Sequence, residues 1–327
     1  MKLKVQCELC PKMCLIEAGQ SGECRVRVNI DGALRTVVYG YPCSIAVDPI
    51  EKKPLFHFLP GTGILSVATV GCNLHCTNCQ NWEISQANPE DEDIRAYSCS
   101  PEKLVALTKQ NNCPSLAYTY TDPIVYYEYT SDSAKLAREA NIRNVLVTAG
   151  YINAEPWKKL LRYVDAANID LKSISDDFYR RVCSATLKPV QNALVMAKAS
   201  GILVEVTNLV IPTLNDEPEQ IGELARWVKV NLGAETPLHF SGFYPRYKMR
   251  NLPPTSLKTL EKARQIAKSE GLDYVYIGNV ASKEGQNTYC PGCKKLLIER
   301  SGFTIMQNRI RGGGCPDCER EIYGVWK

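Results

Sequence analysis

Strand-like and helix-like segments alternate along this chain from about residue 64 to residue 280. The strand candidates are short and rich in β-branched or aromatic residues, as in a parallel sheet that is covered on both faces. They are ILSVATV (64–70), SLAYTY (115–120), NVLVTA (144–149), AANIDLK (166–172), LVEVTNLVI (203–211), PLHFSGF (237–243) and LDYVYIGNV (272–280). Helical patterns lie between them, and Ser100 and Pro218 signal the starts of two of these helices. The alternation predicts an α/β fold, either a (βα) barrel or a doubly wound sheet.

Polar residues gather where the predicted strands end. They include Asp122, Thr148, Asp170 with Lys172, residues 205–208 and His239. In parallel α/β folds the carboxyl ends of the strands form the active-site face. Each residue alone would be interpreted as a capping or turn residue, but their recurrence after successive strands predicts a shared site.

The two ends of the chain differ in kind from this middle part. Residues 1–60 carry turn signals and four cysteines, and residues 281–327 carry CPGC and CPDC around a short β-like stretch. Neither end has enough apolar residues for a core of its own, so each is expected to be a small appendage stapled by metal. The predicted organisation is therefore a Cys-rich extension (1–60), a core (61–280) and a zinc-ribbon-like extension (281–327).

Fifteen cysteines stand in a chain whose N-terminus, MKLKVQCELC, lacks the apolar stretch of a secretion signal. In a reducing, cytoplasmic setting such density indicates metal sites rather than disulfides. No segment is long and apolar enough for a membrane span, and a net charge of +4 gives no basic face for nucleic acid. The four isolated cysteines are interpreted as small buried hydrophobes; they are Cys43, Cys99, Cys113 and Cys183.

The segment GCNLHCTNCQN holds Cys72, Cys76 and Cys79 in a C-x3-C-x2-C arrangement directly after the first predicted strand. Three thiolates on one loop can ligate three irons of a [4Fe–4S] cluster, which normally takes four cysteines. No fourth cysteine lies nearby in the sequence, so one iron is left for the amino and carboxylate groups of S-adenosylmethionine (SAM). One electron from the reduced cluster would then cleave SAM to methionine and a 5′-deoxyadenosyl radical. Zinc is the competing interpretation: a structural zinc needs four ligands and a catalytic zinc needs three plus water. His75 is the other candidate ligand on this loop, but it is adjacent in sequence to Cys76 and poorly placed to share its metal.

Several segments together resemble one branch of the radical SAM superfamily. The run TVGCNLHCTNCQN, then TYTDP, NVLVTAG, NIDLK, PLHFSGFYPRYKM and VYIGNV resemble the radical SAM component of the AmmeMemoRadiSam system, a relative of the pyruvate formate-lyase activating enzymes. The resemblance implies a partial (βα)6 barrel of the TIM type, open on one side. It also implies a one-electron donor of the flavodoxin or ferredoxin class, and Memo-type and Amme-type proteins as partners.

The resemblance further implies which residues bind SAM. Its amino group would meet Asp122, and its carboxylate would meet Thr148 and Lys172. Asp170 would bind the ammonium group or shape its pocket, and the ribose and adenine would lie beside His239, Gly278 and Asn279. The chain departs from the family at Asn78, where an aromatic residue usually packs on the adenine, and at residues 121–123, where relatives have a Gly-Gly-Glu turn.

The two flanking cysteine sets have metal-ligand spacing. The N-terminal set, C-x2-C-x3-C-x9-C, suits either a tetrahedral zinc or an auxiliary iron–sulfur cluster; it comprises Cys7, Cys10, Cys14 and Cys24. The C-terminal set is close to a zinc-ribbon pattern, which favours structural zinc; it comprises Cys290, Cys293, Cys315 and Cys318.

The sequence therefore predicts a radical SAM enzyme that abstracts a hydrogen atom from an unidentified substrate. One alternative is a glycyl-radical-enzyme activase, whose substrate is a protein. The others are a non-enzymatic zinc-binding protein and a plain iron–sulfur electron carrier, although a carrier would need neither a barrel nor an open cluster iron.

Overall fold

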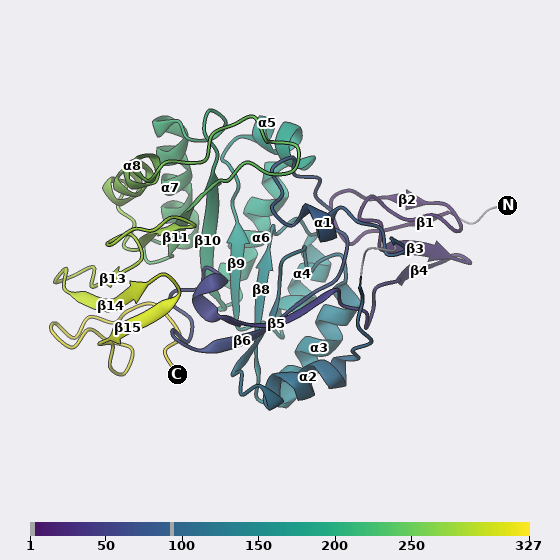
Figure 1. The fold of residues 1–327 in the computed structure, drawn as a ribbon, viewed down its shortest axis with the longest axis horizontal. Coiled ribbons are helices and arrows are strands. Elements are labelled where there is room, and N and C mark those ends of the chain that lie inside the picture. The colour runs from purple at the N-terminus through teal and green to yellow at the C-terminus, as the bar shows by residue number, and fades with distance from the viewer. Residues whose placement is uncertain (1–3, 92–94) are drawn as a thin grey trace.

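A computed structural model of the chain describes residues 4–91 and 95–327 and is built around one eight-stranded sheet (Figure 1). The strand order is β12-β11-β10-β9-β8-β7-β6-β5, so neighbours in the sheet are neighbours in the chain. Seven of these strands are parallel. They are β6 (Gly63–Ala68), β7 (Ser115–Tyr118), β8 (Arg143–Thr148), β9 (Ala166–Asp170), β10 (Leu203–Val210), β11 (Leu238–Gly242) and β12 (Val275–Gly278). Each predicted strand overlaps one of them; β8 has the predicted length, and the other six observed strands are shorter by one to five residues.

Helices connect successive parallel strands and cover the sheet. They are α1 (Trp82–Ser85), α2 (Pro101–Gln110), α3 (Tyr127–Glu139), α4 (Ala154–Leu161), α5 (Asp176–Phe178), α6 (Leu187–Ala199), α7 (Pro218–Leu232) and α8 (Leu257–Ser269). The Ser100 side chain caps α2 by accepting the Lys103 N–H at 3.4 Å, and Pro218 stands in the first turn of α7, as the sequence predicts. The main core lies between these helices and the sheet, where the strand residues are buried almost throughout.

The first residues of the sheet come from a segment that the sequence groups with the N-terminal extension. Strand β5 (Ser44–Pro49) pairs antiparallel with β6, from Ser44 opposite Ala68 to Pro49 opposite Gly63. A short 3-10 helix, η1 (Ile50–Lys52), follows it. Residues 44–60 are therefore part of the core structure. Before them lie two small hairpins, β1 (Val5–Gln6) with β2 (Leu15–Ile16) and β3 (Arg27–Ile30) with β4 (Ala33–Thr36).

The C-terminal segment forms a three-stranded antiparallel sheet of β13 (Thr288–Tyr289), β14 (Leu296–Ser301) and β15 (Thr304–Asn308). Figure 1 shows this sheet on one side of the central sheet and the hairpins β1–β4 on the other. Phe56, Tyr276, Leu297 and Ile298 belong to one buried cluster, so the C-terminal sheet shares a core with β12. Within the described part of the chain, the helices are too short or too polar to cross a bilayer.

Candidate active site

A cavity of about 300 Å³ opens where the parallel strands end. Because β6 to β12 run in the same direction, the segments that follow them meet at one edge of the sheet. Nine of the residues predicted to hold the cluster or SAM line this cavity. They are Cys72, Cys76, Asn78, Cys79, Asp122, Thr148, Asp170, Lys172 and Asn279.

The loop after β6 carries the three cysteines and is fixed by backbone contacts. The His75 N–H donates to the Cys183 carbonyl at 3.1 Å, and the Thr77 N–H donates to the Val182 carbonyl at 2.9 Å. Both acceptors lie in η2 (Tyr179–Cys183), a π-helical turn. Burial raises the pKa of the Cys72 and Cys79 thiols. These sulfurs are thus protonated in the metal-free chain, and a metal that binds them must displace the protons.

We expected no fourth cysteine near the three-cysteine loop. This expectation is correct along the sequence, but in the folded chain a fourth cysteine does lie close to the loop. Cys183, expected to be a plain buried hydrophobe, lies within hydrogen-bonding reach of the Cys76 sulfur, and this contact together with burial raises the pKa of Cys76 well above its usual value. The irons of a cubane each bind a different thiolate, which keeps the ligand sulfurs apart. Cys183 is therefore placed to contact the Cys76 sulfur rather than to hold an iron of its own.

Asp122 is held by groups from the neighbouring strand end. The Thr148 hydroxyl donates to its Oδ1 at 2.8 Å, and the Ala149 N–H donates to its Oδ2 at 2.9 Å. The Ile124 N–H also donates to Oδ1, at 3.2 Å. Burial raises the pKa of Asp122, although these donors act in the opposite direction. The carboxylate thus joins the ends of β7 and β8 and fixes the Thr148 hydroxyl at the cavity wall.

Lys172 and Asp170 form an ion pair at the end of β9, with 2.7 Å between Lys172 Nζ and Asp170 Oδ2. Burial by itself lowers the pKa of Lys172, but the charges of Asp170 and Cys76 raise it well above its usual value. The Lys172 backbone is held as well, since Asn208 and Asn215 donate to its carbonyl at 3.1 and 2.8 Å. A fixed cation and a fixed anion therefore stand side by side in the cavity, which suits a zwitterionic ligand.

Two polar atoms of the cavity wall have no hydrogen-bond partner among the described residues: Asn78 Oδ1 and Thr207 Oγ1, both buried. A buried acceptor without a partner costs free energy unless a ligand or water supplies a donor. The donor-rich edges of an adenosine or an amino acid would satisfy such atoms. These two acceptors, the three thiols and the Lys172–Asp170 pair are the groups that a cluster and a bound nucleoside-containing amino acid would need. The residues of the cavity therefore fit both.

Two of the predicted SAM contacts lie elsewhere. His239 is near the start of β11 and is 2% exposed, and its Nε2 donates to the Glu205 carboxylate at 2.7 Å. Glu205 also accepts the His57 N–H at 2.7 Å, so His239 belongs to a buried polar network under the C-terminal sheet. The structure therefore does not bring His239 to the cavity. Gly278 ends β12 beside the cavity without lining it, and Asn279 follows it with a φ of +60°.

Sequence reasoning missed a charged group on the cavity wall. Asp48 of β5 binds Lys52 and Lys53, each at 2.7 Å, and also accepts from Ser66 and from the Tyr120 hydroxyl. Lys52, Lys53 and Tyr120 line the cavity. Burial lowers the pKa of Lys53 to about 8, although Asp48 acts in the opposite direction. The only sequence signal was the Asp-x3-Lys-Lys spacing, which cannot show that β5 joins the sheet.

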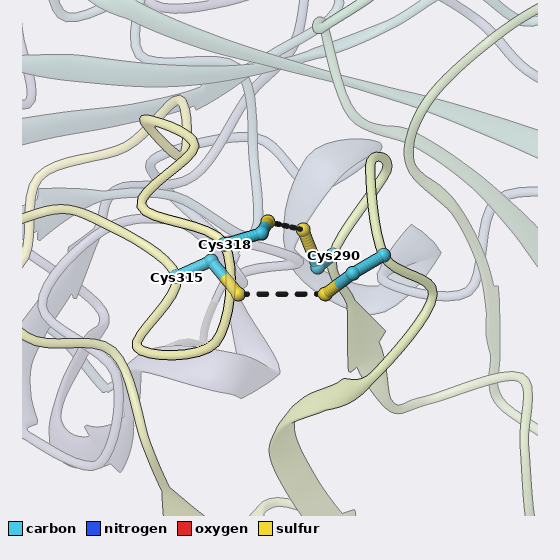
Figure 2. Close-up of side chains that lie close together, drawn as sticks. Cys290, Cys315 and Cys318 are labelled. Atoms are coloured by element: carbon cyan, nitrogen blue, oxygen red, sulfur yellow. Dashed lines mark hydrogen bonds between the residues drawn. The ribbon is translucent and has the colours of Figure 1, made fainter.

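The four C-terminal cysteines gather into one group whose sulfurs all lie within 4.8 Å of one another (Figure 2). Cys290 and Cys318 sulfurs are 3.5 Å apart, and those of Cys293 and Cys315 are 3.7 Å apart. Backbone N–H groups of Asp317 and Cys318 lower the pKa of Cys315 to about 7, although burial acts in the opposite direction. Four convergent thiols with amide donors can hold a metal ion.

Comparison with known proteins agrees with this geometry. The model of the radical SAM superfamily matches residues 66–228, which run from β6 into α7. This range contains the three-cysteine loop and the strand ends that carry Asp122, Thr148, Asp170 and Lys172. An α/β sheet with these groups at its carboxyl edge defines the class, and the chain belongs to the radical SAM superfamily.

The uncharacterized protein MJ0808 of Methanocaldococcus jannaschii is 50% identical over 98% of this chain and 95% of its own length. The pyruvate formate-lyase-activating enzyme of Clostridium pasteurianum is 24% identical over 64% of this chain and 92% of its own length. Among solved structures, a radical SAM methyltransferase from Sphaerobacter thermophilus has a TM-score of 0.52 at 16% identity, covering 67% of this chain and 66% of its own. This last likeness shows the fold alone.

Proposed function

We propose that the chain is a radical SAM enzyme with a [4Fe–4S] cluster on Cys72, Cys76 and Cys79, within a partial (βα)6 barrel. The observation that carries the proposal is the convergence of three thiols, an Asp–Lys pair and two unpartnered acceptors on one cavity of about 300 Å³. When bound and reduced, the cluster would pass one electron to SAM and break its C5′–S bond, giving methionine and a 5′-deoxyadenosyl radical that takes a hydrogen atom from the substrate.

The side chains of the cavity divide the binding of SAM between them. Lys172 would bind the SAM carboxylate, and Asp170, 2.7 Å away, would keep the ammonium group of Lys172 in place and meet the SAM amino group. Asp122 acts mainly through Thr148, because it accepts that hydroxyl at 2.8 Å. The Gly150 N–H donates to the Thr148 oxygen at 3.0 Å, so this oxygen keeps one lone pair for a donor in the cavity. Asn78 and Asn279 would line the adenosine part.

The C-terminal cysteine group supports a structural zinc. Around one zinc with Zn–S bonds of about 2.3 Å, tetrahedral geometry places the sulfurs about 3.8 Å apart. The observed separations of 3.5 and 3.7 Å are close to this value. Zinc would hold the two CPxC turns together, and β13–β15 would then cover Phe56 and Tyr276.

A protein substrate is the second candidate. It is favoured by the similarity to two activating enzymes, that of pyruvate formate-lyase and, at 23% identity over 65% of this chain and 71% of its own length, that of 4-hydroxyphenylacetate decarboxylase from Clostridium scatologenes. The motifs of the AmmeMemoRadiSam branch favour instead Memo-type and Amme-type partners. Incubation of the reduced enzyme and SAM with each candidate protein, followed by electron paramagnetic resonance (EPR), separates the two, because only an activase leaves a glycyl radical on its target.

The test of the main proposal is SAM cleavage by the reconstituted chain. The protein is loaded anaerobically with iron and sulfide, reduced with dithionite or with a flavodoxin, and assayed for 5′-deoxyadenosine. We expect product from the wild type and from Cys113→Ala, a buried cysteine far from the loop in sequence, and none from Cys76→Ala. A fully loaded and reduced wild-type cluster that yields no product, and whose EPR spectrum SAM leaves unchanged, would refute the proposal.

A further inference from the structure

The four N-terminal cysteines surround a small cavity of their own, separate from the SAM cavity. Cys7, Cys10 and Cys14 belong to the turn between β1 and β2, and Cys24 precedes β3. All four line this cavity together with Asn73. The turn is closed by the Cys7 N–H, which donates to the Cys14 carbonyl at 2.9 Å, and by Met13 at a φ of +47°. None of these cysteines forms a disulfide.

The spacing of these sulfurs differs from that of the C-terminal set. The C-terminal four all lie within 4.8 Å of one another, whereas among the described residues no three of the N-terminal sulfurs do. A single zinc needs sulfurs about 3.8 Å apart. A cubane binds each thiolate at a different iron and therefore needs them farther apart. The three sulfurs of the central loop likewise do not all lie within 4.8 Å of one another.

A buried cation faces this cavity. The Arg27 side chain is 10% exposed and its NH1 group binds Glu128 at 2.8 Å. Among the described residues its buried Nε has no hydrogen-bond partner, and the guanidinium lies within hydrogen-bonding reach of the Cys7 sulfur. A buried N–H donor without a partner calls for an acceptor, and four cluster thiolates with their sulfides would supply both the acceptor and the negative charge.

We infer that Cys7, Cys10, Cys14 and Cys24 ligate a second [4Fe–4S] cluster, in which every iron has a protein ligand. With four cysteines such a cluster has no free iron, so SAM does not bind there. The chemistry open to it is one-electron transfer.

The second site lies directly behind the radical SAM loop. Cys72 lines the SAM cavity, and Asn73, the next residue, lines the N-terminal cavity. Gly71 has a φ of +89°, and a Cβ atom there would lie 2.6 Å from the Cys24 carbonyl oxygen. Only glycine allows the two cysteine-bearing segments to approach this closely. The two clusters would therefore stand on either side of residues 71–73, an arrangement suited to passing an electron from one to the other.

The test uses the full chain with Cys72→Ala, Cys76→Ala and Cys79→Ala combined, reconstituted anaerobically with iron and sulfide. This variant keeps the N-terminal cysteines and has no SAM site, so its result is independent of the proposed SAM chemistry. We expect about four iron and four sulfide per chain, an EPR signal on reduction, and no change in that signal when SAM is added. Two results would overturn the inference. A variant that contains two zinc ions and no iron per chain would show that the N-terminal cysteines bind zinc. A variant that contains one zinc ion and no iron would show that they bind no metal.

A second variant removes N-terminal cysteines and keeps the three cysteines of the central loop, so it tests the second cluster in a chain that can still bind SAM. Cys7→Ala with Cys24→Ala is expected to lower the iron content from about eight to about four per chain while SAM still perturbs the remaining EPR signal. The matched control, Cys99→Ala with Cys113→Ala, removes two isolated cysteines and should keep about eight. If the Cys7→Ala/Cys24→Ala variant and the control variant have the same iron content per chain, the inference fails even if the proposed function stands.

Discussion

Asp122 accepts the Thr148 hydroxyl at 2.8 Å and thereby joins the ends of β7 and β8, two neighbouring parallel strands. Both side chains are buried, at 4% and 3% exposure, yet both line the SAM cavity. A carboxylate that is engaged in this way orients its neighbour more than it offers a free charge.

Replacement of Thr148 tests this relationship. Thr148→Val keeps the shape but removes the donor, which leaves a buried carboxylate oxygen with one donor fewer and costs about 1–3 kcal/mol of stability. We expect SAM affinity to fall about tenfold, equivalent to about 1.4 kcal/mol. Thr148→Ser should restore both. Equilibrium binding of SAM to the reconstituted protein measures the effect, and equal affinities for Val and Ser would contradict it.

Lys172 is expected to account for a larger share of SAM binding. Lys172→Met removes the cation but keeps the length of the side chain, so the SAM carboxylate loses a charge-assisted partner in a partly buried site. The expected loss is about 10- to 100-fold in SAM affinity, or about 1.4–2.8 kcal/mol, with iron content unchanged. The control is Lys109→Met, at an exposed position of α2. Unaltered affinity in the Lys172 variant would remove this residue from the site.

Cys183 gives a prediction about cluster ligation. Because its thiol contacts the Cys76 sulfur without holding an iron, Cys183→Ala should keep the iron content and the formation of 5′-deoxyadenosine. The reduction potential of the cluster should shift, since contacts to the ligand sulfurs tune it. Iron analysis and a redox titration followed by EPR measure both. A variant that loses iron would show instead that Cys183 is a ligand.

Removal of the C-terminal metal should loosen one part of the molecule selectively. Cys318→Ala takes away one of four ligands, and we expect about one zinc per chain to be lost or held weakly. Hydrogen exchange should then accelerate in β13–β15, whose small sheet depends on the metal, and stay slow in β6–β12. Cys113→Ala should retain the zinc. Unchanged exchange in a zinc-free variant would exclude a structural role.

The buried His57 side chain should make the free energy of unfolding depend on pH. Its Nδ1 lies 2.5 Å from the Tyr323 carbonyl, which only accepts, so Nδ1 carries the proton and Nε2 accepts from the Tyr276 hydroxyl at 2.6 Å. Burial lowers the pKa of His57 to about 4 from 6.5. The unfolded chain therefore binds the extra proton first, and stability falls as pH drops below 6.5.

Between pH 6.5 and 5 this group should remove about 1.6 kcal/mol from the free energy of unfolding. Urea denaturation at several pH values measures the slope, and comparison with His57→Gln separates His57 from the carboxylates. The variant should lose less stability over this interval. Parallel curves for the two proteins would show that His57 is not the group responsible.

Much of the fold could be predicted from local patterns. Each parallel strand was recognised because buried strands are short, apolar runs between helical segments, and this property belongs to the residues of the strand itself. Ser100 and Pro218 mark helix starts for equally local reasons. Strand β5 was missed, because it pairs with the sheet edge and its residues are only partly buried. The spacing of cysteines likewise identified the three sets, since ligands on one loop must be close in sequence to meet one metal.

Only the tertiary structure determined which residues that are distant in the chain contact one another. The sequence placed Asp122, Thr148 and Lys172 at strand ends, but only packing shows that Asp122 is bound to Thr148 and that Cys183 reaches Cys76. The same holds for His239, which has a polar partner in Glu205 on the neighbouring strand and therefore lies away from the cavity. Such contacts depend on strand register and on which face each side chain takes, and a shift of one residue would reverse the face. Local composition determined the elements of this protein; the register of the assembled sheet determined which side chains share a site.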